Sequence, residues 1–245
     1  MRARLDQMFL SAPRAPLDVK AVEAYREQSA TTAFYQGPGA FDGRPGTYYV
    51  NLFDMQAMPK YEIESLAYHE ALPGHHMQIA LAQEIPELPS FRRFSSRYTA
   101  YVEGWGLYCE QLPKEMGLYD DPYSDFGRLS AELWRACRLV VDTGIHSASR
   151  RWSREKAIQY LRDNTPNSER DVTNSIERYI VQPGQATAYK VGMRRIQDLR
   201  AEAEAALGGK FDVRAFHDVV LVSGAVPLDV LSDNVRDWVS AVSPT

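Results

Sequence analysis

Three of the chain's five histidines lie within the eight residues His69-Glu-Ala-Leu-Pro-Gly-His-His. Imidazole nitrogens are common zinc ligands, and a glutamate beside a ligating histidine can take a proton from metal-bound water. The octet therefore predicts a catalytic zinc site, with His69 as a ligand and Glu70 placed to act as the base.

The spacing of these histidines differs from the His-Glu-x-x-His pattern of many zinc sites. His75 lies six positions after His69, so a regular helix of about 100° per residue would place the two on different sides. Pro73 and the glycine after it predict a kink or a bulge of about two residues, which would bring His75 beside His69. We therefore expect His69 and His75 to be ligands and His76 to lie next to the site. The alternative is a helix that ends at Leu72, with histidines that only cap or pack.

A catalytic zinc site also needs a third protein ligand. Glu103 is the best candidate, because it lies in the apolar and aromatic segment 100–108, which has helical periodicity. Its aromatic neighbours predict burial, and a buried carboxylate needs a cation or a metal as its partner. Glu110 lies seven residues further on and would share a face of a regular helix with Glu103. We favour Glu103, although the alternative for either acid is a solvated surface position. Gly104 and Gly106 would let another backbone or a substrate approach this helix closely.

Four segments of the sequence together resemble the signature blocks of the domain-of-unknown-function 885 family. In order they are HEALPGHHMQ (69–78), YVEGWGLY (101–108), RLVVDTGIH (138–146) and RYIVQPGQATAYKVG (178–192). That family is similar to the gluzincin metallopeptidases, a wider group that includes carboxypeptidase Taq and angiotensin-converting enzyme.

The resemblance implies one zinc ion, Zn2+, per chain, held by His69, His75 and Glu103, with Glu70 as the general base. Members of the family usually have a large helical region ahead of the part that this chain resembles. We therefore expect residues 1–245 to form the C-terminal, metal-bearing domain of a longer architecture.

Hydrolysis of an amide also requires a donor to the oxyanion of the tetrahedral intermediate. By analogy with gluzincins we expect Tyr189 to be this donor, with Tyr179 as the second candidate. His146 is a further candidate, because it lies four residues after Asp142 and could hydrogen-bond to it on one helix face. It could then donate to the substrate or support the metal site. The alternatives are tyrosines that pack between helices and an Asp–His pair that is purely structural.

Two arginines, Arg135 and Arg138, are candidates for binding a carboxylate of the substrate. A guanidinium group can grip a carboxylate with two parallel hydrogen bonds, and such a contact would imply carboxypeptidase action. The alternative is that both arginines belong to a charged, solvated helix face.

The composition is typical of a globular protein, and we expect one domain over residues 1–245. The chain has 44% hydrophobic residues, enough for a full core, and we expect no transmembrane segment because no apolar run approaches about 18–20 residues. Its 28 basic and 32 acidic residues give a formal charge of −4, which argues against nucleic-acid binding.

The first residues lack the apolar stretch of a secretory signal, although longer relatives can be exported or lipid-anchored. Cys109 and Cys137 are too few for a disulfide framework, so we expect buried free thiols.

The expected fold is mainly α, a gluzincin-like bundle of several helices with a small β element. Two β-prone runs around a Gly/Pro-rich loop predict a hairpin at 33–54. Within it, Tyr48–Phe53 could be an edge strand that aligns an extended peptide, and the alternative is a small sheet that only packs against helices. Periodicity and punctuation by Pro and Gly predict helices at 17–29, 61–84, 96–113, 124–149, 154–163, 168–181, 185–206, 212–222 and 227–241.

These features together predict a zinc-dependent metallopeptidase that cleaves peptide bonds by Glu70-assisted attack of metal-bound water. The expected partner is a peptide or a small amide substrate. The alternatives are a zinc hydrolase of a non-peptide amide or ester, a non-catalytic metal-binding fragment, and a helical protein without metal. Two histidines and one glutamate suit zinc well, and they also suit manganese, cobalt or nickel.

Overall fold

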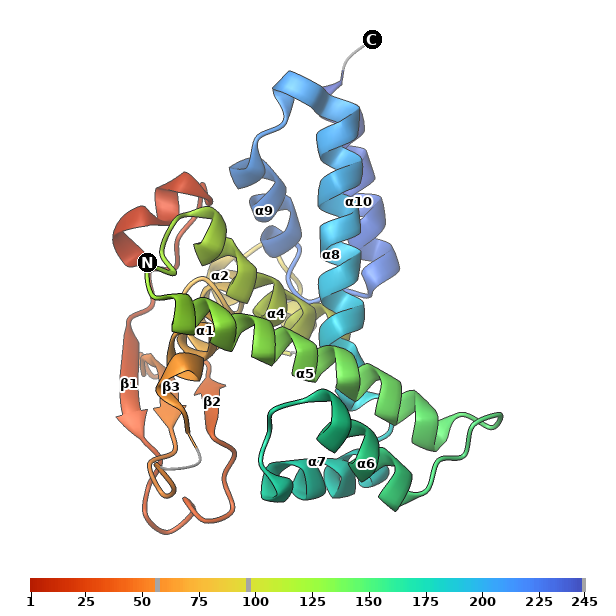
Figure 1. Cartoon of the computed structure of the whole chain (residues 1–245). Coiled ribbons are helices and arrows are strands. Elements are labelled where there is room, and N and C mark those ends of the chain that lie inside the picture. Colours follow the sequence, from red (N-terminus) through yellow and green to blue (C-terminus); the bar gives the residue numbers. More distant parts are fainter. Residues whose placement is uncertain (56–57, 96–97, 244–245) are drawn as a thin grey trace.

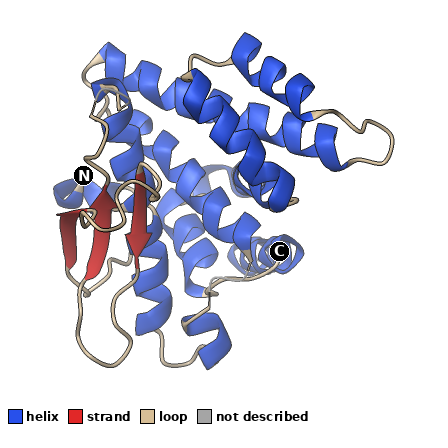
Figure 2. Cartoon of the chain, turned by 90° about the horizontal axis from the view of Figure 1, so that it is seen from below, coloured by secondary structure: helices blue, strands red, loops and turns tan. Residues whose placement is uncertain are grey.

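The computed structural model describes residues 1–55, 58–95 and 98–243. It is mainly α-helical with one small sheet, as predicted (Figures 1 and 2). The strands are β1 (Leu17–Ala21), β2 (Ala33–Gln36) and β3 (Gly46–Val50), and two short 3-10 helices cover Arg2–Gln7 and Gly208–Lys210. The α-helices are α1 (Lys60–Glu70), α2 (His75–Glu84), α3 (Ser90–Arg93), α4 (Thr99–Glu115), α5 (Pro122–His146), α6 (Arg154–Asn164), α7 (Glu169–Val181), α8 (Gln185–Leu207), α9 (Val213–Val222) and α10 (Leu228–Val242).

The sheet has the order β1-β3-β2, with β3 parallel to β1 and antiparallel to β2. The predicted antiparallel pair at 33–54 is therefore present, with Tyr35 opposite Tyr48. Two expectations were wrong. The segment 17–29 contains β1 and turns instead of a helix, because the alternation of Leu17 and Val19 with polar residues also fits a strand. The expected edge strand Tyr48–Phe53 begins inside β3, which is the central strand, and the two outer strands are β1 and β2.

The helical conformation is interrupted between α1 and α2, whereas we expected one kinked helix over 61–84. Helix α1 ends at Glu70, and α2 begins at His75. Pro73 has no backbone N–H to continue the helix, and its carbonyl accepts hydrogen bonds from the Trp105 indole at 3.0 Å and the Cys109 thiol at 3.3 Å. Buried hydrogen bonds therefore hold the segment between α1 and α2 against α4.

Helices α4 and α8 form the centre of the main core. A Cβ atom on Gly104 would lie 2.5 Å from the backbone of Gly192, so the two helices touch through their backbones. Buried aromatic residues of α4, including Trp105, belong to the same core cluster as residues of α8, α9 and α10. In Figure 1, α10 runs beside α8 along its length.

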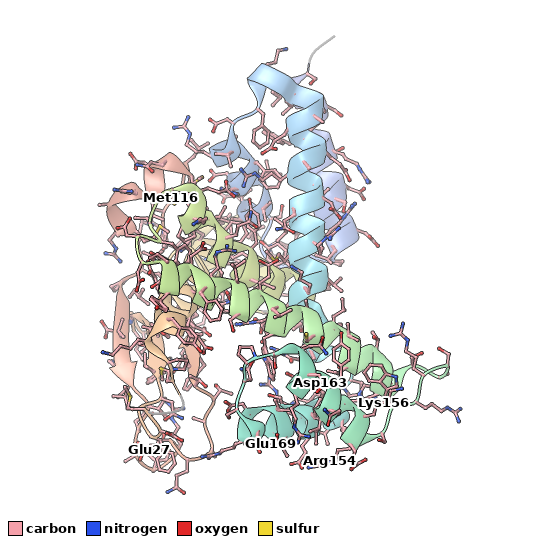
Figure 3. All side chains as sticks on the ribbon, viewed as in Figure 1. Glu27, Met116, Arg154, Lys156, Asp163 and Glu169 are labelled. Carbon is pink, nitrogen blue, oxygen red and sulfur yellow. The ribbon has the colours of Figure 1, made fainter. Side chains whose placement is uncertain are left out.

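A second, smaller cluster joins α5, α6 and α7 through Val141, Leu161 and Ile176. Charged side chains of this part, such as Arg154 and Glu169, are exposed and lie on its outside (Figure 3).

Two expectations from composition are confirmed. In the described part of the chain, no helix combines the length and the apolar character needed to cross a bilayer. Cys109 and Cys137 are buried free thiols. Burial raises the pKa of both thiols, so neither has the features of a reactive thiolate.

His217 fastens the N-terminal segment to the core. Its Nδ1–H donates to the Met8 carbonyl at 2.7 Å, and its Nε2 accepts from the Tyr108 hydroxyl at 2.9 Å. Burial lowers the pKa of His217 to about 3, so the folded protein holds the neutral ring. A proton on Nε2 would remove the acceptor that Tyr108 uses.

We expect the free energy of unfolding to fall as the pH falls below about 6.5, because the unfolded chain then protonates His217 and the folded chain does not. His217→Gln keeps a donor and an acceptor and removes the titration. The difference in slope between wild type and variant should reach up to about 1.4 kcal/mol per pH unit between pH 4 and 6. Urea unfolding at several pH values measures it, and equal slopes would contradict the assignment.

Candidate metal centre

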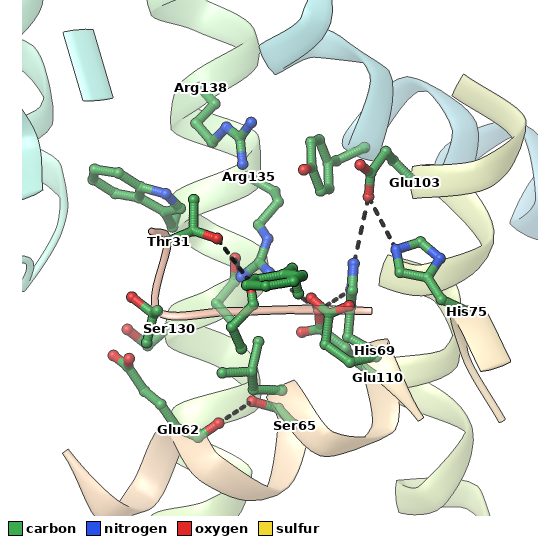
Figure 4. A pocket seen from close by; sticks show the side chains of 18 of the residues that line it. Thr31, Glu62, Ser65, His69, His75, Glu103, Glu110, Ser130, Arg135 and Arg138 are labelled. Atoms are coloured by element: carbon green, nitrogen blue, oxygen red, sulfur yellow. Dashed lines mark hydrogen bonds and ion pairs between the residues drawn. The ribbon is translucent and has the colours of Figure 1, made fainter. Parts of the chain in front are cut away.

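Three side chains from three helices converge at one point, as Figure 4 shows. His69 belongs to the last turn of α1, His75 is the first residue of α2, and Glu103 projects from α4. Oε2 of Glu103 lies 3.4 Å from Nε2 of His69 and 3.4 Å from Nε2 of His75. The three candidate ligand atoms all lie within 4.8 Å of one another. The break between α1 and α2 thus brings together the two histidines that a regular helix would separate.

The two distances from Glu103 to the histidines fit a tetrahedral metal ion. Ligands about 2.0–2.1 Å from zinc at tetrahedral angles are about 3.3–3.4 Å apart, which matches the distances from Glu103 to both histidines. Two imidazoles, one carboxylate and an open fourth position form a donor set typical of catalytic zinc. The residues of this chain therefore suit the ion that the sequence implied.

His76 lies beside the cluster and faces away from it. Its Nδ1 is 2.8 Å from the Tyr35 hydroxyl, and its Nε2 is 3.2 Å from the carbonyl of Ala15. Both ring nitrogens are therefore engaged with the sheet and the segment before it. His76 fixes α2 to the sheet, and His75 is the residue that joins His69.

Gly106 makes room for the two imidazoles. A Cβ atom at this position of α4 would lie 2.7 Å from Cε1 of His69 and 3.1 Å from Cε1 of His75. Any larger residue would push at least one ring away from Glu103. Both glycines thus permit the expected close approach. The backbone of α8 approaches Gly104, and the two histidines approach Gly106.

Glu110 orients His69, a role that the sequence analysis did not assign. Its Oε1 accepts a hydrogen bond from Nδ1 of His69 at 2.8 Å, which leaves Nε2 available to a metal. The Arg135 guanidinium lies 3.4 Å from the same oxygen. Glu110 is only 2% exposed, so these contacts stabilise its charge. The seven-residue spacing from Glu103 was the available signal, because it places both acids on one face of α4.

Carboxylates thus lie next to both ring nitrogens of His69. Burial lowers the pKa of this histidine, but Glu103 and Glu110 outweigh that effect and raise it to about 9. Burial similarly raises the pKa of Glu103, but hydrogen bonds to His69 and His75 hold it well below its ordinary value. The gathered negative charge favours a cation at this point.

The cluster lines a cavity of about 430 Å³. Glu70 also lines it, is 8% exposed, and has no hydrogen bond or ion pair from its carboxylate to any described side chain. Tyr189 reaches the cavity from α8, and its ring lies 6.1 Å from the ring of His69. Burial, followed by the charge of Glu103, raises the pKa of Tyr189, so its hydroxyl keeps the proton that it would donate.

Tyr179 and His146, the other two candidates, lie outside this cavity. The Nε2–H of His146 donates to the backbone carbonyl of Tyr179 at 3.0 Å. Asp142 does not form the expected contact with His146, because both its oxygens accept from the backbone N–H of Gly184. These residues connect α5 to α7 and to the turn before α8, and none of them is among the residues that line the cavity. Their contact with substrate stays a prediction.

We expect Gly106→Ala to weaken zinc binding by at least ten-fold while the helical content is retained, because the added methyl group would displace the imidazoles and not the core. Titration with zinc, followed by circular dichroism, measures both effects. Gly209→Ala is the matched control, since a Cβ atom there would meet nothing within 4 Å. Unchanged affinity in Gly106→Ala would show that the rings do not need this space.

Glu110→Gln should lower zinc affinity by about 10–100-fold, the usual effect of losing a carboxylate that orients a ligating histidine. Competition with a chromogenic chelator gives the dissociation constant. Glu87→Gln changes the charge equally at an exposed position and should have no effect. If both variants bind zinc as wild type does, the contact between Glu110 and His69 has no role in holding the metal.

Comparisons with other proteins agree with the fold. The sequence profile described as "Bacterial protein of unknown function (DUF885)" matches residues 1–235. A "putative lipoprotein" from Colwellia psychrerythraea has a similar structure, with 48% identity and a TM-score of 0.94 over 98% of this chain and 41% of that one. A "putative lipoprotein of unknown function" from Shewanella oneidensis has 25% identity and a TM-score of 0.77 over 95% of this chain and 42% of that one. This chain therefore spans about two fifths of the length of each. No curated protein matches it. The match over nearly the whole sequence shows that the chain belongs to the DUF885 family of bacterial proteins of unknown function.

Proposed function

We propose that the protein is a zinc-dependent hydrolase, and specifically a metallopeptidase. One observation carries this proposal. His69, His75 and Glu103 present three ligand atoms within 4.8 Å of one another, with Glu103 3.4 Å from each histidine, in the wall of a cavity that Glu70 also lines. A purely structural metal site would use four protein ligands and would not need an adjacent base.

The three ligands would hold one zinc ion. When bound there, zinc would polarise a substrate carbonyl and lower the pKa of a coordinated water toward about 7. Glu110 would keep the ring of His69 in the orientation that the ion requires, since it accepts the hydrogen bond from Nδ1. The chain itself then has to move one proton and stabilise one developing charge.

Glu70 is placed to move the proton. Its carboxylate accepts a proton from the attacking water and passes it to the nitrogen of the leaving amine as the C–N bond breaks. Tyr189 stabilises the developing charge, because its protonated hydroxyl can donate to the oxygen of the tetrahedral intermediate. The two residues line the same cavity as the ligands, on α1 and α8.

The edge strand β2 supports a peptide as the substrate. Ala33, Phe34 and Tyr35 all line the cavity. Because consecutive strand residues point to opposite faces, a cavity lined by all three lies along the backbone edge of the strand. An extended peptide could add to this edge by main-chain hydrogen bonds. Such alignment was expected of Tyr48–Phe53, and β2 takes that place because β1 and β2 cover both sides of β3.

We expect protein purified without chelators to contain about one zinc per chain and to hydrolyse peptides. Glu70→Gln should retain the zinc and lose at least 10²-fold in kcat, the usual effect of removing a general base. His69→Ala should lose both zinc and activity, and it serves as the metal-free reference. Plasma mass spectrometry and a mixed peptide library read by mass spectrometry measure the two quantities.

The outcomes separate the competing functions. Zinc without cleavage of any peptide, but with cleavage of esters or small amides that depends on Glu70, would favour a non-peptide hydrolase. Stoichiometric zinc with no hydrolysis at all would favour a metal-binding module. Full activity of Glu70→Gln would remove that residue from the mechanism.

A further inference from the structure

We propose that Arg138 binds the free α-carboxylate at the C-terminus of the substrate, so that the enzyme removes residues from the ends of peptides. This inference rests on the proposed peptidase function and specifies its substrate. The side chain reaches from α5 into the cavity that holds the histidine–glutamate cluster (Figure 4). It also has features that the partly buried Arg135, which lines the same cavity, lacks.

Arg138 is a buried guanidinium group without a counter-ion. The residue is 7% exposed, yet no carboxylate of the described chain lies within ion-pair distance of it. Its only side-chain hydrogen bond goes to Oε1 of Gln185 at 3.2 Å, and its buried Nε has no partner among the described residues. Arg135, in contrast, is paired with Glu110 at 3.4 Å. A buried charge is costly unless an opposite charge meets it, and an anionic ligand would supply that charge.

The nearest acid on the same helix does not fill this role. The charge of Asp142, one turn after Arg138, acts on Arg138, but the two side chains form no ion pair in the described chain, and both oxygens of Asp142 accept the backbone N–H of Gly184. Glu62 also lines the cavity; burial raises its pKa, and Arg135 is the positive charge that opposes this effect. The guanidinium of Arg138 therefore keeps most of its five donors for a ligand.

The surroundings of Arg138 hold it in a defined orientation. Its guanidinium carbon lies 4.2 Å from the ring centre of Tyr189 and 5.2 Å from that of Tyr179. Stacking on aromatic rings is a favourable arrangement for arginine and leaves its edge free for two parallel hydrogen bonds. Tyr179, which lies outside the cavity, thus contributes to the site only by supporting Arg138.

The position of Tyr189 sets the distance between the carboxylate and the reacting bond. Its ring centre lies 4.2 Å from the guanidinium carbon of Arg138 and 6.1 Å from the ring centre of His69. The guanidinium and the His69 ring are therefore at most about 10 Å apart, and since one extended residue spans about 3.5 Å, a carboxylate at Arg138 would be no more than about three residues from a carbonyl at the metal ligands. The bond placed for cleavage is therefore close to the C-terminal end of the peptide.

Binding can be measured without turnover. Chelator-treated protein is titrated with N-acetylphenylalanine and with N-acetylphenylalaninamide, which differ only in the free carboxylate, and affinities are obtained by calorimetry or ligand-observed NMR. Removing the metal excludes its contact with the carboxylate, and circular dichroism confirms that the fold is retained. We expect the acid to bind at least ten-fold more tightly than the amide.

Arg138→Met should abolish this preference, and Arg138→Lys should retain only part of it, because an ammonium group cannot form the two-bond contact. If Arg138→Met fails to fold, Arg138→Lys still gives the test. Arg178→Met is the matched control: Arg178 lines the same cavity, is exposed, and bonds to Gln182. It should keep the preference. Equal binding of acid and amide, a preference that survives in Arg138→Met, or an equal loss in Arg178→Met would each overturn the assignment.

Turnover of the zinc-loaded protein separates this inference from the proposed function. Peptides with a free C-terminus should be cleaved, and the same peptides with an amidated C-terminus should be cleaved at least ten-fold more slowly. Glu70-dependent cleavage of both forms at equal rates would overturn the role of Arg138 and leave the peptidase proposal standing. A preference for the carboxylate in binding without any hydrolysis would support the role of Arg138 and overturn the peptidase proposal.

Discussion

The site depends on one close contact between two helix backbones. Gly104 of α4 and Gly192 of α8 leave no side chain between the helices, and the backbones meet directly. This approach places Glu103 and Tyr189, each within a turn of the crossing, in the wall of one cavity. It also directs the aromatic residues on the other face of α4 into the main core. A larger distance between the two helices would separate Glu103 from Tyr189 and would also loosen the packing of the core.

The charges of the cavity are distributed unevenly. Glu70, Glu103 and Glu110 gather around the histidines, while Arg135 and Arg138 extend from α5. Arg135 is paired with Glu110, so the guanidinium of Arg138 and the carboxylates of Glu62 and Glu70 are left without an ion-pair partner in the described chain. Such opposed, uncompensated groups destabilise an empty cavity and favour a ligand that carries the complementary charges.

Much of the fold could be predicted from the sequence. The helices from α4 to α10 begin and end within a few residues of the expected positions, except that the first two residues of the expected helix at 96–113 lie outside the described part. Local periodicity and punctuation are enough for such elements. The strand β1 was missed, because five residues with alternating polarity become a strand only when β3 pairs with them.

The candidate site could likewise be predicted only in part. His69, His75 and Glu103 could be grouped because residue type and the resemblance both pointed to them, and the structure brings them together. The partners of Glu110, Arg138 and His146 are set by contacts between helices far apart in the sequence. No local pattern reveals that one arginine meets a carboxylate and another does not, or that a histidine donates to a carbonyl on α7.

The sheet has two outer strands in the described chain, and they meet their surroundings differently. The strand β1 carries Asp18 and Lys20, which pair with each other at 3.2 Å and are about half exposed. Charges on an outer strand discourage a second molecule from extending the sheet, which is a common route to aggregation. The strand β2 has no such charges in Ala33–Gln36, and it forms part of the cavity wall. The recess thus sets the edge of β2 back in a cavity wall, where it has a protection that β1 obtains from its charged side chains.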